Sequence, residues 1–519
     1  MKSARREKIK FQLRRFKSFM ATLFKNKKAA TGVFIIIFFT IMAVVGPMTT
    51  DSDPIKPGST DYGELPKAAS LCLPSWYRLF NPNLTETMDL SRDPKFEDPN
   101  LITWDAIETS KESIKVEYSD FGHDNPGSTK IVFTEPGKAK LKINFEYPFS
   151  KPIEQFKIWA DFYLNATIEK EIEITEAKVS ASVYFQKDGK HYPILVPPHG
   201  LTFQFRKGSE VGIGGWVVVH NFMDSFHLTV VNYYKQTYLE EPNNVIFSSP
   251  ANMSLVVEVT YKADESVIDE IKDVTFYVDN FYAILYGETF GLLGTDQSQR
   301  DIYAQLVYGA RWSLIIGLGT AAISVLIGLI VGLLAGFLGG AVDEVLMRFT
   351  DMLLVLPTLP LLLILIFVLG QSMINIILVL TLLGWMGFAR TVRSMVLSLK
   401  ERAFIESARA AGASTGHIIL RHIVPNVMSL VYISLAMSVP SAIVSEASLS
   451  WLGLGPLDVM TWGRILFEFN RSGLRTAGAF AFWYWTVVPG ICIAALSLSF
   501  ILIGYAMDEI LNPKLRERR

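Results

Sequence analysis

The sequence MLLVLPTLPLLLILIFVLGQSMINIILVLTLLGWMGFA, at residues 352–389, contains no charged side chain. A helix needs about 20 apolar residues to cross the hydrocarbon core of a bilayer. The 38 residues of this run are therefore enough for two spans, and Gly370-Gln371-Ser372 favour a reversal between them. Four more uncharged runs are each long enough for one span, at residues 29–50, 312–342, 427–445 and 476–507. The sequence therefore predicts six transmembrane helices.

Charge is distributed unevenly along the chain. The net charge is +10 over residues 1–50, −14 over residues 51–300 and +3 over residues 301–519. Because basic segments stay in the cytoplasm, we expect both termini there and the acidic segment on the other side of the membrane. A basic region of about 28 residues and the lack of a small-x-small cleavage site favour a retained first helix over a signal peptide.

The composition excludes three classes of protein. A segment with a net charge of −14 does not suit a nucleic-acid-binding protein. Two cysteines in 519 residues exclude a disulfide scaffold and a zinc ribbon, so Cys72 and Cys492 are expected to be unpaired thiols.

Residues 51–290 have a different pattern from the rest of the chain. Apolar and polar side chains alternate at residues 141–145, 156–164, 179–185, 216–220, 226–234, 255–261 and 274–285. Alternation of this kind, broken by Gly, Pro and Asn, predicts antiparallel strands. The absence of a long amphipathic helix favours an inserted all-β domain outside the cytoplasm, a β-sandwich of jelly-roll type. Residues 51–125 are less regular and are interpreted as a lead-in to this domain.

Several side chains of this domain are candidates for functional sites. The stretch 274–284 resembles the last strand of jelly-roll carbohydrate-binding modules, and Asp279-Asn280 are expected to lie exposed on it. His199, His220 and His227 lack the spacing of metal ligands, so no metal site is predicted. Asn83, Asn165 and Asn252 fit the acceptor pattern for N-glycosylation.

The polar segment at residues 400–426 predicts two short helices joined by a tight turn. Gly412 suits the left-handed position that ends a helix. Ser414 can cap the amides of the second helix, and Pro425 fits the first turn of the fifth span. Small residues on the first helix allow close approach of a groove on a partner protein. An ordinary helical connector without a partner is the alternative.

The same segment carries a family resemblance. Glu406-Ser-Ala-x-x-x-Gly412, followed by Ile423-Val-Pro425, resembles the EAA loop of ATP-binding-cassette (ABC) importer permeases. Further segments match the C-type subunit of the dipeptide/oligopeptide branch, in order along the chain: Phe24-Lys-x-Lys-Lys-Ala-Ala-x-Gly32, Leu293-Gly-Thr-Asp296, Tyr308-Gly-Ala-Arg311-x-Ser313, Gly339-Gly-x-x-Asp343-Glu-x-x-Met347-Arg-x-x-Asp351 and Glu446-Ala-Ser-Leu-Ser-Trp-Leu-Gly-Leu-Gly455.

Three features depart from the family pattern. Ser407 replaces the usual alanine of the EAA loop, and Gln299 replaces the usual glycine before Arg300-Asp301. The family normally has a short outer loop after its first span, so the insertion of about 250 residues is the largest departure. We expect it to be a platform or lid for a binding protein, or a structural cap.

The resemblance implies a division of the chain. An all-α polytopic membrane domain with the inserted β domain is expected, bounded as follows: basic arm 1–28, first helix 29–50, extracytoplasmic domain 51–290, permease core 291–513 with the EAA loop at 400–426, and cytoplasmic tail 514–519. The protein would lie in a prokaryotic cell membrane, embedded in the lipid bilayer.

The resemblance also implies partners. These are a second permease subunit, two cytoplasmic ATPases and an extracytoplasmic substrate-binding protein, with no nucleic acid. The chain has no phosphate-binding loop, so it is expected to bind no cofactor and to be a transporter subunit without catalytic residues. The residues expected to couple it to the ATPase are Phe404, Ile405, Glu406, Ser407, Ala408, Ala411, Gly412, Ile423 and Pro425.

Three functions stay open at this point. The branch favours import of oligopeptides and dipeptides, whereas the jelly-roll pattern also suits an oligosaccharide importer. A membrane-anchored binding or adhesion protein on a permease scaffold is the third. The spans hold almost no ionisable side chain, with Glu446 at one outer end, which argues against ion-coupled transport. Pro357, Pro360, Pro440 and Pro489 are expected inside spans, as kinks or as passive packing elements.

Overall fold

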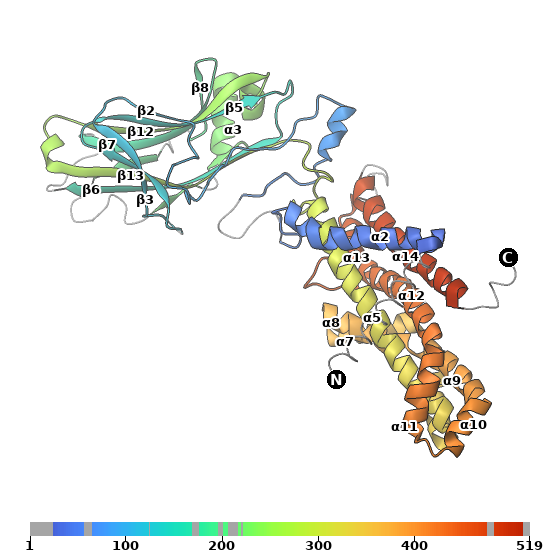
Figure 1. Cartoon of the computed structure of the whole chain (residues 1–519). Coiled ribbons are helices and arrows are strands. Elements are labelled where there is room, and N and C mark those ends of the chain that lie inside the picture. The colour runs from blue at the N-terminus through green and yellow to red at the C-terminus, as the bar shows by residue number, and fades with distance from the viewer. Residues whose placement is uncertain are drawn as a thin grey trace. The chain divides into compact units, whose positions relative to one another are not determined.

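A computed structural model describes residues 24–56, 65–123, 125–168, 176–195, 201–205, 216–219, 222–474 and 482–511. The chain divides into two compact units (Figure 1). We call Lys56–Arg300 the β-unit, and Met1–Ile55 with Asp301–Arg519 the helical unit. Each is described by itself.

The β-unit contains two antiparallel sheets. The first has the order β10 (Val217–Val218), β6 (Gln155–Ile168), β13 (Ile271–Tyr286), β4 (Ser128–Phe133) and β3 (Ile114–Ser119), with β1 (Met88–Asp89) on β13 and β11 (Met223–Asp224) on β6. The second has the order β2 (Ala106–Thr109), β5 (Gly137–Tyr147), β12 (Ala251–Ala263), β7 (Ala177–Lys187) and β8 (Lys190–Pro193), with β9 (Leu201–Gln204) on β7.

The two sheets share one hydrophobic core, as in a β-sandwich. Their aromatic rings meet between the layers: Phe156 of β6 lies 5.5 Å from Phe185 of β7, and Phe203 of β9 lies 5.2 Å from Phe276 of β13, measured between ring centroids. The predicted strands at residues 141–145, 156–164, 179–185, 255–261 and 274–285 are confirmed. Period-two alternation located them because one face of each strand is buried in this core.

Some predictions for the β-unit were wrong. Residues 226–234 do not form a strand: Leu228–Tyr238 is the helix α3, capped by His227, whose ring nitrogen accepts from the Thr229 N–H. Its buried side chains, Val230 and Tyr234, are four residues apart, a helical spacing that the β-branched composition obscured. Residues 106–119 of the supposed lead-in supply β2 and β3.

Other predictions concern residues that the structure describes only in part. The strand expected at residues 216–220 is reduced to Val217–Val218, and His199 and His220 lie outside the described residues. The described part of the chain holds no group of three metal-ligating side chains. The short helices η2 (Ser75–Leu79), α4 (Pro242–Ile246) and η3 (Ile268–Glu270) complete the β-unit.

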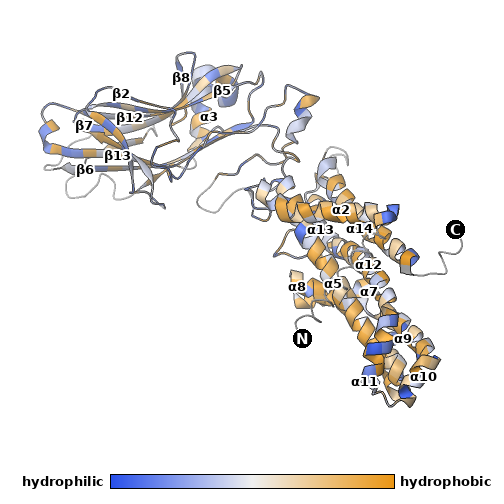
Figure 2. Cartoon of the chain, in the orientation of Figure 1, coloured by the Kyte–Doolittle hydropathy of each residue, from blue (hydrophilic) through white to orange (hydrophobic). Residues whose placement is uncertain are grey.

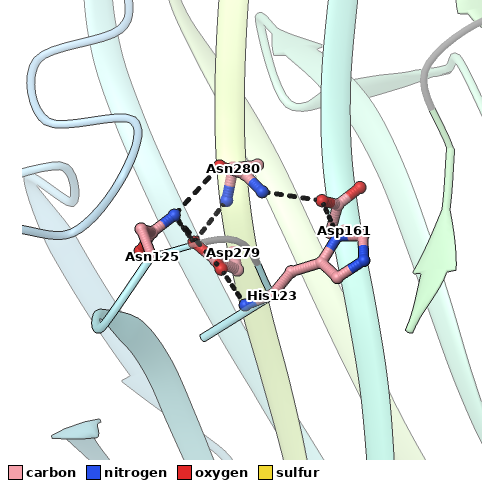
Figure 3. Close-up of polar contacts among 5 residues, drawn as sticks. All are labelled: His123, Asn125, Asp161, Asp279 and Asn280. Atoms are coloured by element: carbon pink, nitrogen blue, oxygen red, sulfur yellow. Dashed lines mark hydrogen bonds and ion pairs between the residues drawn. The ribbon is translucent and has the colours of Figure 1, made fainter. Parts of the chain in front are cut away.

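Asp279 and Asn280 are buried, against the prediction that they are exposed: 0% and 7% of their surface is accessible. The register of β13 with β6 shifts after Asp279, which turns these side chains into a polar cluster (Figure 3). The His123 N–H donates to Asp279 at 2.7 Å, and Asn280 donates to Asp161 at 2.8 Å. His123 Nδ1 lies 2.8 Å from the same Asp161 carboxylate. A strand pattern alone cannot show this compensation of buried polar groups.

The β-unit should lose stability as the pH rises through the pKa of Asp279. Burial raises this pKa from 3.8 to about 6, although N–H groups of His123 and Asn280 oppose the rise. Since the folded value exceeds the unfolded one, the contribution of protonated Asp279 is complete below pH 3.8 and is lost above about pH 6. A rise of about two pKa units corresponds to roughly 3 kcal/mol at most.

The change Asp279→Asn copies the protonated form, so it should remove this part of the pH dependence. Native-state hydrogen exchange of the β13 amides in the full chain, corrected for the intrinsic pH effect, measures it. His123 and Asp161 face the same cluster and stay unchanged in both proteins. Parallel stability profiles of wild type and variant between about pH 4 and pH 8 would contradict the prediction.

The turn at residues 296–300, which contains Gln299, is held by the side chain of Asp296. The Asp296 carboxylate accepts from the N–H groups of Ser298 and Arg300, at 2.8 and 2.9 Å, and its other oxygen meets Arg300 Nε at 2.7 Å. Gln299 has a φ of 63°, in the left-handed region that glycine adopts without strain. This conformation accounts for the glycine that the family places here.

The long helices of the helical unit are predominantly apolar, whereas α9, α10 and α11 also carry hydrophilic residues (Figure 2). The helices are α2 (Lys27–Val45), α5 (Ile302–Leu338), α6 (Gly340–Val355), α7 (Thr358–Leu369), α8 (Met373–Gly384), α9 (Met386–Lys400), α10 (Ala403–Ala410), α11 (Thr415–Ile418), α12 (Val424–Leu449), α13 (Trp462–Arg471) and α14 (Trp483–Leu511), with the 3-10 turn η1 (Gly46–Thr49) and the π-helical turns η4 (Ile419–Ile423) and η5 (Ser450–Leu454).

Five described helices are long and apolar enough to cross a membrane, or six if the pair α6 and α7 counts as one span. The chain breaks at Gly370–Ser372 as predicted: Gly370 has a φ of 93° and the Ser372 side chain caps α8. However, the 38-residue run is not two straight spans. The 12 residues of α7 cover about 18 Å. Instead, α6 and α7 meet at a bend of 92° beside Pro357, while α8 and α9 together form the next span.

Glycines bring α5 and α9 into close contact. Cβ atoms placed on Gly328, Gly332 and Gly336 would lie 2.8, 2.5 and 3.0 Å from the backbone oxygens of Trp385, Ala389 and Arg393. Both sets of residues are four apart, so the two backbones approach along three successive turns. Close packing of small residues stabilises helix pairs in lipid, where the hydrophobic effect between helices is absent.

Candidate coupling site

We call residues 400–426, which connect α9 to α12, the elbow. As predicted, this segment contains a tight turn between two short helices. Helix α10 ends at a Schellman motif: the Gly412 N–H donates to the Arg409 carbonyl at 3.0 Å, and the Ala413 N–H donates to the Ala408 carbonyl at 3.1 Å. Gly412 has a φ of 81°, which confirms the predicted left-handed conformation. A Cβ there would meet no atom within 4 Å, so the backbone conformation and not space selects glycine.

The second half of the elbow is continuous with a span. Ser414 caps α11 as predicted, accepting from the His417 N–H at 3.4 Å. Helix α11 does not end before the fifth span but passes through η4 into α12, so that Thr415–Leu454 is one candidate span. Pro425 lies in the first turn of α12, where it has no N–H for the carbonyl of Arg421. The π-helical turn η4 ends at Ile423, two residues before this proline.

The nine predicted coupling residues divide into two groups. Ile405 and Ile423 are buried, in a cluster with Leu333 of α5 and Val392 and Val396 of α9. Ala408 is half-buried against the same cluster. These three side chains hold the elbow on the helical unit. The exposed group consists of Phe404, Glu406, Ser407, Ala411, Gly412 and Pro425.

Leu420 and Ser407 are two exposed residues of the elbow. Leu420 is 72% exposed, and it was not among the predicted coupling residues. The sequence offered only one indication of it, an apolar residue within a polar segment. The hydroxyl of Ser407 donates to the Ala403 carbonyl at 2.9 Å within its own helix. Serine therefore replaces the usual alanine without needing another partner.

Ion pairs hold α9, which leads into the elbow, against α6. Arg393 meets Asp343 with two hydrogen bonds, at 2.5 and 2.6 Å, and Arg390 pairs with Asp351. Lys400 donates to the Gly336 carbonyl at 3.2 Å, where α5 ends. The bidentate geometry orients α9 as well as attracting it. Asp343 and Asp351 both belong to the motif at residues 339–351 that carries part of the family resemblance.

At the far end of α12, Glu446 is buried and bound on one oxygen by two hydroxyls. Ser450 and Thr461 each donate to its Oε1 at 2.7 Å. Thr461 also caps α13 by accepting from the Arg464 N–H at 3.2 Å. Glu446 thus ties α12 to α13, which is a packing role. Neither Cys72 nor Cys492 forms a disulfide within the described residues, in agreement with the prediction.

Family models match both parts of the helical unit. Residues 328–517 match the model of "Binding-protein-dependent transport system inner membrane component". Residues 15–66 match the "N-terminal TM domain of oligopeptide transport permease C".

Individual relatives agree with these models. The chain is 37% identical over 226 residues to the oligopeptide transport system permease protein OppC of Bacillus subtilis, a match that covers 43% of this chain and 72% of the relative. It is 36% identical over 224 residues to the dipeptide transport system permease protein DppC of the same organism, covering 43% and 68%. Among solved structures, the MetNI methionine ABC transporter is similar at 20% identity, 40% and 95% coverage, and a TM-score of 0.31.

The two family models and the OppC and DppC relatives confirm the resemblance that the elbow and its flanking motifs suggested. The matched residues, 15–66 and 328–517, include the elbow and several of the motifs that carry the resemblance. We conclude that this chain belongs to the oligopeptide/dipeptide ABC permease family, as a subunit of the C type.

Proposed function

We propose that this chain is one of two permease subunits in an ATP-driven importer of oligopeptides and dipeptides. Two cytoplasmic ATPases would power the transporter, and an extracytoplasmic binding protein would deliver the peptide. The names of the relatives support the substrate class. The elbow carries the proposal for coupling, because it presents an exposed surface on a firmly anchored support.

In this mechanism, the exposed group of the elbow lies in a groove of one ATPase. Closure of the ATPase dimer on ATP would then push on α10 and α11. Because α11 continues into α12 without a break, this displacement reaches the span directly. The buried isoleucines and the pair of Asp343 with Arg393 pass it to α5, α6 and α9. ATP hydrolysis itself belongs to the partner subunits.

The proposal fixes an orientation. The elbow must face the cytoplasm to meet an ATPase, so both termini lie in the cytoplasm and residues of about 51–300 lie outside it. The basic N-terminal arm and C-terminal tail and the net charge of −14 of residues 51–300 support this arrangement.

Purification of the intact complex through a tag after Arg519 tests the proposal. We expect two ATPases and a second permease to co-purify, and the reconstituted complex with its binding protein to import labelled peptide when ATP is present. A complex that imports oligosaccharide and not peptide would contradict the substrate class. The absence of any ATPase, under conditions that preserve other membrane complexes, would contradict the coupling role and favour the anchored binding protein.

A further inference from the structure

A cavity of about 140 Å³ lies among helices α5, α7, α8 and α12 of the helical unit. Six hydroxyl groups line it, and no charged side chain does. The hydroxyls belong to Thr320 and Ser324 of α5, Thr358 of α7, and Ser438, Ser441 and Ser445 of α12. Their spacing along α5 and α12 places them on one face of each helix. The rest of the lining is formed by alanine, leucine and glycine.

Two of these hydroxyls are buried without a partner. Thr320 and Ser324 are 4% and 3% exposed, and neither hydroxyl makes a hydrogen bond within the described residues. Two other buried hydroxyls of the helical unit bond to their own helix: Thr350 and Ser499 donate to backbone carbonyls at 2.7 and 2.6 Å. Thr381 of α8 and Ser497 of α14 also have no partner among the described residues, but neither lines the cavity. A buried hydroxyl without a partner lowers stability. Because Thr320 and Ser324 line the cavity, a ligand from outside the chain could supply the missing hydrogen bonds there.

A glycine keeps the space beside one of them open. A Cβ on Gly384 of α8 would lie 2.7 Å from the Ser324 hydroxyl oxygen. The Ser324 side chain thus has room only because α8 presents a glycine there. On the other side, Thr358 and Ser441 are exposed, so the cavity opens to the surface of the helical unit.

The chemistry of the lining selects uncharged hydrogen-bonding groups. A hydroxyl both donates and accepts, and it rotates to suit its partner. It can therefore pair with either the N–H or the C=O of a peptide unit, whatever the side chain beside it. Walls without charge do not trap charged side chains or termini electrostatically. The volume is well below the ~300 Å³ or more of a site that encloses a whole ligand, so only a short segment fits.

We infer that this hydroxyl-lined cavity contacts the backbone of the peptide in transit, with Thr320 and Ser324 as its binding groups. The inference rests on the proposed import of peptides and adds the residues that touch the substrate. It explains how one path serves peptides of different sequence, because the contacts are made to the groups that all peptides share.

The double variant Thr320→Val with Ser324→Ala tests this inference, since it removes both hydroxyls with little change of volume. In the reconstituted complex, kcat/KM for ATP-driven import of labelled peptide should fall about tenfold, which corresponds to a loss of 1.4 kcal/mol. The melting temperature should be unchanged or higher, because two unpartnered polar groups are removed from the interior. Ser499→Ala is the matched control: its hydroxyl is buried but bonded to its own helix, so import should stay normal.

A direct contact assay gives a second measurement. A photo-reactive amino acid that replaces the exposed Ser441 should crosslink to labelled peptide in the complex that contains the full-length chain. Import at the wild-type rate by the double variant would overturn the inference and leave the proposed function intact. A wild-type complex that imports no peptide would overturn both. If the double variant and the Ser499→Ala control lost import equally, the cause would be a general packing defect. That result would also overturn the inference.

Discussion

Phe404→Asp should abolish ATP-driven import while the amount of protein in the membrane stays normal. Phe404 lies on α10 and is 44% exposed, with its ring centroid 6.4 Å from that of His422. An exposed apolar ring at a site that meets a partner protein is a typical source of binding energy, and its loss costs about 2 kcal/mol or more. A carboxylate in the same groove adds the cost of burying an unpaired charge.

The neighbouring residue provides the matched comparison. Ile405 is buried in the cluster with α5 and α9, so Ile405→Asp should unfold the elbow and lower the level of the protein. Phe404→Asp changes an exposed position and should cost the fold only about 0.5 kcal/mol or less. Membrane levels, co-purification of the ATPases and import of peptide separate the two effects. Normal co-purification and import with Phe404→Asp would remove this ring from the interface.

Local chemistry made much of the structure predictable. The alternation of large apolar residues located β5, β6, β7, β12 and β13, because each strand buries one face in the sandwich. Gly412 and Ser414 were assigned correctly because a helix end and a helix cap depend on a few neighbouring residues. Helix α3 was missed for the same reason, since its β-branched residues favour a strand locally and only the buried pair of Val230 and Tyr234 reveals the helix.

Features that depend on distant segments could not be predicted. A count of uncharged residues cannot distinguish two spans from a pair of helices bent at Pro357, because both need the same number of residues. The spacing of Gly328, Gly332 and Gly336 is visible in the sequence, but the carbonyls that they approach are not. The cavity requires four helices to meet, and the missing partners of Thr320 and Ser324 can be recognised only after they have met.

The contact of α5 with α9 leads to the second large effect. Gly332→Ala should destabilise the helical unit strongly, because the new Cβ would lie 2.5 Å from the Ala389 carbonyl oxygen and 2.6 Å from the Val392 Cβ. These are backbone or branched positions that cannot move aside, so α9 must shift. Overpacking of this kind costs about 1–3 kcal/mol. Because α9 leads into the elbow, import should fall further than the amount of folded protein does.

Gly319→Ala separates this clash from the general effect of adding a methyl group to α5. The nearest atom to a Cβ at Gly319 is the Ile377 Cδ1, at 3.9 Å, which is ordinary contact. Alanine there should be neutral or should stabilise the helix by up to about 1 kcal/mol, because glycine is the poorer helix former. Thermal unfolding of both variants in the same detergent measures the difference, which we expect to be about 2 kcal/mol or more. Equal stability of the two variants would mean that α5 and α9 can separate without loss, and the elbow would then rest on its isoleucine cluster and its ion pairs alone.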